Sequence, residues 1–143
     1  MPAAASVPAT AAQPASRSHA KAGEVLDRQV LEQLSKVRTN GKPELLARVI
    51  NLYLAESPKL VQKLKQAAGA SDARAIARSA HSLKSSSANV GAKVLSGYCA
   101  DIEASARRAD TEEARKILAK IETEHGSVQS ALAAEVEALT SKA

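Results

Sequence analysis

The stretch ARAIARSAHSLKSSSANV, residues 73–90, decides the fold of this chain. An α-helix advances by about 100° per residue, so residues three or four positions apart share a face. On that spacing, six small or medium-sized residues form one stripe: Ala73, Ile76, Ala80, Leu83, Ser87 and Val90. A stripe of this kind is typical of a helix in a tightly packed bundle. We therefore predict a helix that Ser71 and Asp72 open and that Gly91 closes.

The opposite side of this predicted helix carries Arg74, Arg78, His81, Ser85 and Ala88. His81 is therefore predicted to point away from the core, between arginines on the preceding turns and small residues on the following turns. An exposed histidine on a helix often has no function. Here, however, the small side chains at positions 85 and 88 would let a partner surface approach the ring. Lys84 adds an ammonium group beside His81, where it would stabilise added negative charge.

The imidazole of His81 is chemically suited to accepting a phosphoryl group. An unperturbed imidazole has a pKa of about 6.5, so the ring is largely neutral at cytoplasmic pH. A neutral ring nitrogen is a competent nucleophile toward an activated phosphoryl group. The chain has no Gly-rich phosphate loop and no nucleotide-binding signature. We therefore expect the phosphoryl donor to be another phosphoprotein, which also brings the catalytic metal, rather than ATP.

Two further helices are predicted before this one. Asp27 can cap a short helix that ends near Val37. A long helix then starts at Pro43, since proline suits the first helical turn, and ends at Gly69. Pro58 falls inside it, and we expect a kink or a break there because proline removes a backbone hydrogen bond.

Two more helices are predicted after Gly91. The first ends near Arg107. The second starts near Asp110, which together with Glu113 resembles a capping box. Gly126 is a candidate interruption of this second helix. Short connections between long amphipathic helices indicate antiparallel neighbours. The predicted fold class is therefore all-α, an antiparallel four-helix bundle with a short additional N-terminal helix.

The composition supports this fold class and limits the function. Strong helix formers dominate, Phe and Trp are absent, and Cys99 is the single cysteine, so no internal disulfide is possible. The net charge of +5 fits ordinary solubility, an acidic partner or nucleic acid. Nucleic acid is the weaker of the two partners, because no Lys/Arg cluster interleaved with aromatic residues occurs. No apolar stretch suits a membrane span or a secretory signal, so we expect a cytoplasmic protein.

Residues 1–22 are rich in Ala, Pro and Ser. Such a segment cannot bury enough apolar surface to offset its ordering entropy, so we predict a disordered tail or an interdomain linker. The predicted folded domain then covers residues 23–143. A linker would make this domain the C-terminal module of a larger protein, and a free-standing protein remains the alternative.

Residues 80–92, AHSLKSSSANVGA, resemble the signature of the histidine-containing phosphotransfer (HPt) domain family. That signature reads Ala-His-x-Leu-Lys-Gly-x-Ser, followed after a short spacer by a Gly-Ala pair. The resemblance extends to residues 43–46, 53–58 and 101–103. Position 85 departs from the signature, with Ser where Gly is frequent. Its side chain would either narrow access to the histidine or donate a hydrogen bond to the phosphoryl group.

The resemblance implies a role for each matching residue. His81 would be the phosphoacceptor and Lys84 would interact with the phosphoryl group. Ser85, Ala88 and Asn89 would line the face that docks a receiver domain, and Gly91 would close the helix. The positive charge of Arg74 and Arg78, also expected to contact the partner, would favour encounter with acidic receivers.

The function implied by the resemblance is that of a bacterial phosphorelay intermediate. It would accept a phosphoryl group from the aspartyl phosphate of one response-regulator receiver domain and pass it to another. The chain would have no kinase site of its own, although it could form part of a hybrid histidine kinase. It would bind no metal or cofactor, with Mg²⁺ held by the partner receiver, and would be a monomer without nucleic-acid or membrane contacts.

Three alternatives remain at this level. A sensor kinase dimerisation domain also phosphorylates a helical histidine, but Ser82 replaces the acidic residue that family prefers and an ATP-binding domain is absent. A non-catalytic helical adaptor would leave His81 incidental. A basic nucleic-acid binder would show strongly salt-dependent affinity for DNA.

Overall fold

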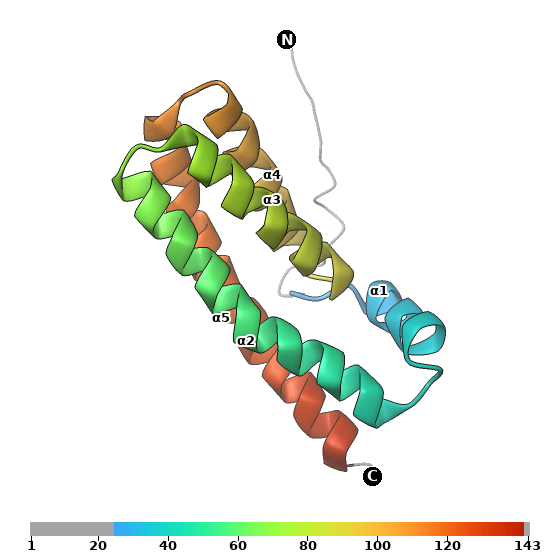
Figure 1. The fold of residues 1–143 in the computed structure, drawn as a ribbon. Coiled ribbons are helices and arrows are strands. Elements are labelled where there is room, and N and C mark those ends of the chain that lie inside the picture. Colours follow the sequence, from blue (N-terminus) through green and yellow to red (C-terminus); the bar gives the residue numbers. More distant parts are fainter. Residues whose placement is uncertain (1–24, 142–143) are drawn as a thin grey trace.

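Five α-helices and one π-helix make up most of residues 25–141, the part of the chain that the computed structural model describes (Figure 1). Their bounds are α1 Arg28–Gln33, η1 Leu34–Arg38, α2 Pro43–Gly69, α3 Ala73–Asn89, α4 Lys93–Arg107 and α5 Thr111–Ser141. No strand occurs in these residues. The all-α prediction is therefore confirmed. The predicted tail, residues 1–22, lies outside the described part.

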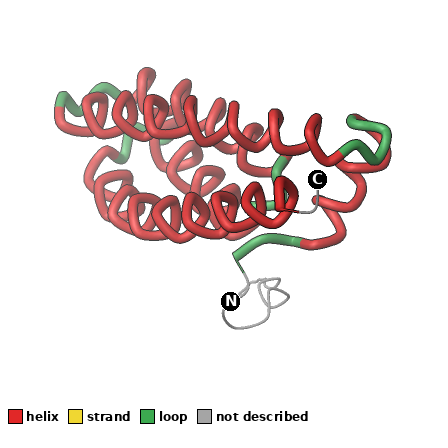
Figure 2. The backbone as a smooth tube through the Cα atoms, turned by 90° about the horizontal axis from the view of Figure 1, so that it is seen from below, coloured by secondary structure: helices red, strands yellow, loops and turns green. Residues whose placement is uncertain are grey.

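Helices α2 to α5 form the four-helix bundle that the short connections predict. Each packs against its neighbour in the sequence, and α5 returns to pack against α2. Figure 2 shows the helical segments running lengthwise beside one another. Helices α2 and α5, with 27 and 31 residues, extend past α3 and α4, which have 17 and 15 residues. The short α1 lies next to the C-terminal end of α3 (Figure 1).

The core lies along the axis of the bundle and receives apolar side chains from every long helix. Its largest fully buried aliphatic residues are Ile50, Leu64, Ile76, Leu83, Leu95, Ile102, Ile121, Val128 and Leu132. Burying a side chain of this size contributes about 1.5–3 kcal/mol. The predicted stripe of α3 is confirmed, since five of its six members are buried and Ala73 is half-buried. This packing fixes the rotation of α3 about its axis and thereby decides which side chains face solvent.

At Pro58 we expected a kink or a break, and no break occurs; the candidate interruption at Gly126 does not occur either. Helix α2 continues through Pro58, and α5 continues through Gly126. A proline inside a helix costs about 3 kcal/mol, and a glycine costs about 1 kcal/mol. Buried residues stand next to both positions, with Ser57 before the proline and His125 before the glycine. Packing of these turns against the rest of the bundle outweighs the local cost.

A buried polar contact joins the two longest helices. The Oγ atom of Ser57 on α2 lies 2.8 Å from Nε2 of His125 on α5. Burial lowers the pKa of His125, which favours the neutral ring. This histidine is enclosed by the bundle and has no access to a partner protein. It therefore serves helix packing.

The N-terminal segment is attached to the end of α3 through Asp27 and Gly91. The side chain of Asp27 caps α1 by accepting a hydrogen bond from the Gln29 amide at 2.9 Å. Its own amide donates to the Gly91 carbonyl at 2.8 Å, and Lys93 forms an ion pair with its carboxylate. Gly91 has φ +84°, a left-handed conformation that suits glycine. A Cβ atom there would lie 2.9 Å from the Asp27 carbonyl oxygen.

Candidate functional site

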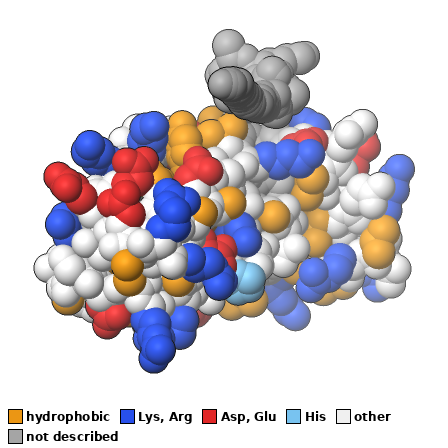
Figure 3. Space-filling model, turned by 90° about the horizontal axis from the view of Figure 1, so that it is seen from above, with side chains coloured by type: hydrophobic (Ala, Val, Ile, Leu, Met, Phe, Trp, Pro, Cys, Tyr) orange, Lys and Arg blue, Asp and Glu red, His pale blue; other side chains and the backbone are white. Residues whose placement is uncertain are grey.

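His81 stands on the outer face of α3, halfway along the helix. Its side chain is 60% exposed, whereas Ala80 and Leu83 beside it in the sequence are fully buried. Figure 3 shows a histidine at the surface with basic side chains around it. The position predicted from the helical spacing is the observed one, because the buried stripe of α3 leaves the opposite side in solvent. A partner protein can reach the ring.

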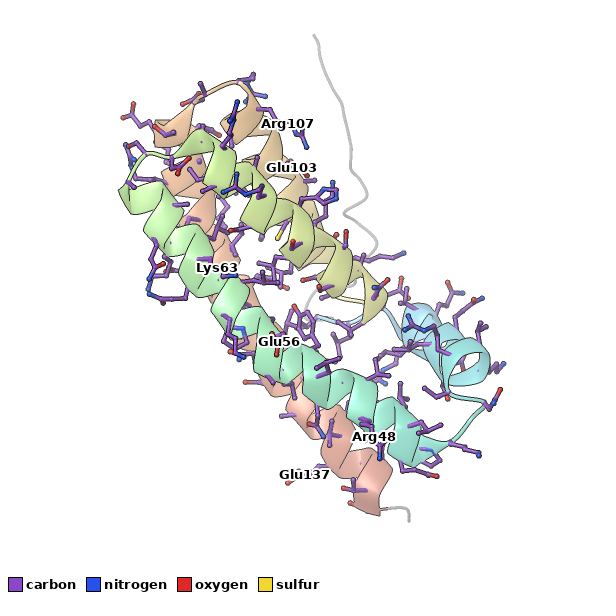
Figure 4. All side chains as sticks on the ribbon, in the orientation of Figure 1. Arg48, Glu56, Lys63, Glu103, Arg107 and Glu137 are labelled. Atoms are coloured by element: carbon purple, nitrogen blue, oxygen red, sulfur yellow. The ribbon has the colours of Figure 1, made fainter. Side chains whose placement is uncertain are left out.

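Beneath His81 lies a buried carboxylate, Glu103 on α4, whose side chain is only 7% exposed. Its Oε2 atom lies 3.2 Å from Nδ1 of His81, and its Oε1 atom accepts a hydrogen bond from Lys84 at 2.8 Å. Arg107, one turn further along α4, donates to Oε2 at 2.6 Å. Figure 4 shows Glu103 and Arg107 following one another on this helix. Three cationic or potentially cationic groups therefore share one carboxylate.

This arrangement keeps Glu103 ionised. Hydrogen bonds from Lys84 and Arg107 lower the pKa of Glu103 from 4.5 to about 2, against the opposing effect of burial. A carboxylate can only accept hydrogen bonds, so Nδ1 of His81 must be the donor in the contact between them. In the neutral ring, the proton then sits on Nδ1 and Nε2 carries a free lone pair. Nε2 has no hydrogen-bond partner within residues 25–141.

Glu103 and Arg107 were not identified as functional residues from the sequence. Residues 101–103 matched the HPt pattern only as a stretch, and the four-residue separation of Glu103 from Arg107 indicates no more than a helix-surface ion pair. The contact with His81 spans 22 residues of sequence. It exists because α3 and α4 pack side by side, which no local pattern encodes. Lys84, predicted to lie beside His81 on the helix surface, also forms an ion pair with this carboxylate.

The predicted docking residues separate into two groups around His81. Arg74 and Arg78 line a shallow groove between α3 and α4 that also includes His81, Ser82 and Arg107. On the other side of His81, the exposed residues of α3 are small and uncharged: Ser85, Ala88 and Asn89. These three do not line the groove. Gly91 lies beyond them, just after the C-cap of α3, and contacts the N-terminal segment.

The described residues offer no metal site. Within residues 25–141, no group of three or more His, Cys, Asp or Glu side chains is placed to hold a metal ion. Cys99 is buried, and burial raises the pKa of its thiol to about 12, so it is not a nucleophile at neutral pH. No helix in this part of the chain is long and apolar enough to cross a membrane.

The ion pairs of Glu103 predict a particular acid sensitivity. Because folding lowers the pKa of this carboxyl group from 4.5 to about 2, its ionised form stabilises the folded state above pH 4.5. That contribution is lost as the pH falls through about 2. We expect Glu103→Gln to lower the free energy of unfolding by about 2 kcal/mol at neutral pH. The difference from the parent should shrink steadily as the pH is lowered below 4.5.

Urea denaturation at a series of pH values measures this difference directly. Glu112→Gln is the matched control, because Glu112 is exposed on α5 and has no ion-pair partner in the described residues. Titration of all other carboxyl groups is common to the variants and cancels in the comparison. A difference between parent and Glu103→Gln that stays constant with pH would show that the carboxylate is not stabilised as described.

The fold and the site together define a class of protein. The described residues form a helical bundle that presents an exposed histidine on an open helix face. Residues 48–142 match the Hpt domain family, and this match covers well over half of the chain. The chain belongs to the Hpt domain family.

Individual relatives agree with this assignment. The chain is 27% identical over 110 residues to histidine-containing phosphotransfer protein 2 of Arabidopsis thaliana, covering 75% of this chain and 70% of the relative. The crystal structure of histidine-containing phosphotransfer protein B from Pseudomonas aeruginosa PAO1 superimposes with a TM-score of 0.73 at 30% identity. That match covers 80% of this chain and 96% of the other.

A putative histidine-containing phosphotransfer protein from rice shares the fold alone. Its sequence is 16% identical, with a TM-score of 0.71 and coverage of 87% of this chain and 89% of the rice chain. Proteins of the Hpt family are phosphotransfer carriers that act in phosphorelays, interact with the receiver domains of response regulators and lack a kinase site of their own.

Proposed function

We propose that this chain is a phosphorelay intermediate in which His81 carries the phosphoryl group. It accepts the group from the aspartyl phosphate of one receiver domain and passes it to the aspartate of another. The observation that carries this proposal is the contact between Nδ1 of His81 and the buried carboxylate of Glu103. The contact places the ring proton on the inner nitrogen and leaves Nε2 as an accessible nucleophile.

The proposed transfer is an in-line displacement at phosphorus. The lone pair of Nε2 forms the N–P bond while the bond between phosphorus and the aspartyl oxygen breaks and the receiver carboxylate leaves. The Nδ1 proton remains hydrogen-bonded to Glu103, which stabilises the positive charge that develops on the ring. In the second half of the relay, a receiver carboxylate attacks phosphorus and the N–P bond breaks.

The remaining residues of the site position the ring and the transferring group. Lys84 and Arg107 hold Glu103, so the ring has a fixed orientation on a rigid helix before the receiver arrives. The Lys84 ammonium, partly exposed, is also placed to interact with phosphoryl oxygens. Mg²⁺ in the acidic pocket of the receiver would neutralise charge on the transferring group. In this proposal, residues 25–141 supply no metal ligand to that step.

The docking face extends along α3 from His81 toward its C-terminal end. Ser85, Ala88 and Asn89 are exposed there, and their short side chains leave room for a receiver to approach the ring. The hydroxyl of Ser85 replaces the glycine frequent at this position and can donate a hydrogen bond to the phosphoryl group. As part of this proposal, the chain works in the cytoplasm as a monomer, either as a free-standing protein or as the C-terminal module of a hybrid histidine kinase.

Reconstitution of the relay tests the proposal. The purified chain is mixed with a receiver domain phosphorylated on its aspartate, and a second receiver is then added. We expect label to appear first on the chain, as an acid-labile and base-stable phosphohistidine, and then on the second receiver. Failure of every receiver of the source organism to label the chain would favour the non-catalytic adaptor instead.

Replacement of Lys84 is expected to slow the transfer without changing the fold. Removing one charge-assisted hydrogen bond at the transferring group corresponds to about a tenfold loss of rate. The change is Lys84→Ala, with Lys63→Ala, an exposed position on α2, as the matched control. Rapid-quench kinetics give the transfer rates, and far-UV circular dichroism gives the helix content. Equal rates for Lys84→Ala and Lys63→Ala would exclude the role.

A further inference from the structure

The surface around His81 is electrostatically asymmetric along α3. On the N-terminal side of the ring, Arg74, Arg78 and Arg107 line one groove. On the C-terminal side, the exposed residues Ser85, Ala88 and Asn89 carry no charge, and the partly exposed Lys84 is paired with Glu103. The carboxylate of Glu103 is shared between Lys84, Arg107 and His81.

The arginines of the groove are available to a partner. Arg74 and Arg78 are exposed and form no ion pair within residues 25–141. Arg107 is anchored through one nitrogen to Glu103, which fixes the direction of its guanidinium group while other N–H donors remain open. Planar guanidinium groups recognise carboxylates with two parallel hydrogen bonds. The groove therefore has the charge and the donor geometry for carboxylates.

We propose that the groove binds an acidic segment of the receiver and so sets the orientation in which the receiver docks. This inference rests on the proposed function and deepens it. Arg74 and His81 are seven positions apart on α3, a distance of about 10 Å along the axis. An extended segment of about three residues spans that distance. A receiver with two or more Asp or Glu residues in such a segment beside its phosphorylation site would place them over the groove.

The side of His81 that carries no arginine completes the orientation. A receiver rotated by half a turn about the His81 direction would place its acidic segment over Ser85 and Ala88, where the nearest positive group of α3 is Lys84, which is already paired with Glu103. That docking would lose the ion pairs with the groove. Complementary charge at an interface increases the rate of association and discriminates against the wrong arrangement. The groove would thus select among receivers as well as orient them.

A double charge reversal in the full chain tests the inference. The variant is Arg74→Glu/Arg78→Glu, and the control is Arg48→Glu/Lys63→Glu, which changes the net charge equally. Figure 4 shows Arg48 and Lys63 on α2, and no residue of that helix lines the groove. Each protein is first phosphorylated on His81 with phosphoramidate, a small donor that needs no receiver. Transfer is then measured to the receiver that the parent phosphorylates fastest, at increasing receiver concentrations.

We expect the groove variant to need about ten times more receiver for half-maximal transfer at low salt, and the control less than twice as much. The maximal rate should stay similar, and the difference should fade at high salt because exposed charges are screened. Equal concentration dependence in groove variant and control would overturn the inference while leaving the proposed function intact. The inference would also be overturned if the groove variant lost only maximal transfer rate, or if its loss of transfer did not depend on the salt concentration.

Two further results would assign the chain or the groove a different role. If the parent is not labelled by phosphoramidate or transfers to no receiver, the proposed function itself fails, and this inference with it. Suppose that the parent chain binds a short duplex DNA and that the groove variant does not, while both transfer phosphate equally. The groove then belongs to a nucleic-acid partner, which also overturns the inference.

Discussion

The variant His81→Gln is expected to accept no phosphoryl group from a phosphorylated receiver while it folds like the parent. Glutamine lacks a nucleophilic ring nitrogen, so labelling should fall by at least about a thousandfold. The side chain is 60% exposed and contributes no core packing, so the free energy of unfolding should change by less than about 1 kcal/mol. Labelling with a phosphorylated receiver and urea denaturation of the same preparation measure both quantities.

A second donor strengthens this test. Phosphoramidate should label the parent on His81, and His81→Gln should lose that label, because the other histidine of the described residues, His125, is buried. His81→Ala should give the same result, which would show that the loss does not depend on the glutamine side chain. Unchanged labelling of either variant by a receiver would remove His81 from the mechanism. Loss of helical structure in both variants would instead contradict the exposed position of the ring.

The largest expected effect on stability is that of Gly91→Ala. The backbone at Gly91 has φ +84°, where an alanine costs about 1–2 kcal/mol. The added Cβ would also lie 2.9 Å from the carbonyl oxygen of Asp27, which is backbone and cannot rotate away. Overpacking of this kind adds about 1–3 kcal/mol. We expect the free energy of unfolding to fall by about 3 kcal/mol in total, with increased hydrogen exchange in residues 26–38.

Two other glycines provide matched controls for this change. Gly97 on α4 and Gly126 on α5 are exposed inside helices, and a Cβ at either position meets no atom within 4 Å. Alanine is a better helix former than glycine, so Gly126→Ala should stabilise the chain by up to about 1 kcal/mol. Opposite signs for Gly91→Ala and Gly126→Ala are the expected result. A Gly91→Ala variant as stable as the parent would show that the N-terminal segment is not held as described.

His81→Gln and Gly91→Ala test two different properties of the surface of α3: its chemistry and its packing. In the proposed function His81 supplies the chemistry, and Gly91 allows the N-terminal segment to pack close against the end of α3. Asp27 and Lys93 add an ion pair at that junction, only a short distance along the chain from Asn89 on the docking face. The proposed phosphotransfer depends on both, because a ring that is to meet the active site of another protein needs a helix that does not move.

Local sequence patterns predicted the helices and the outward direction of His81. Caps such as Asp27, Asp72 and Asp110 act on amides two or three residues away, so their effect is visible in the sequence. The 100° spacing along residues 73–90 separates the buried stripe from the exposed side without knowledge of any other helix. The resemblance of Gly91 and the residues around His81 to the HPt signature also indicated the family.

Tertiary packing decided the features that depend on residues far apart in the chain. Glu103 reaches His81 across 22 positions, and His125 reaches Ser57 across 68, because neighbouring helices bring them together. Packing also kept α2 helical through Pro58, since the burial of its turns outweighs the local cost of a proline, for which the sequence predicts a kink or a break. A periodic pattern shows which side of a helix is apolar. It does not show which helix covers that side. Only the packing of α4 against α3 brings the shared carboxylate of Glu103 beneath His81.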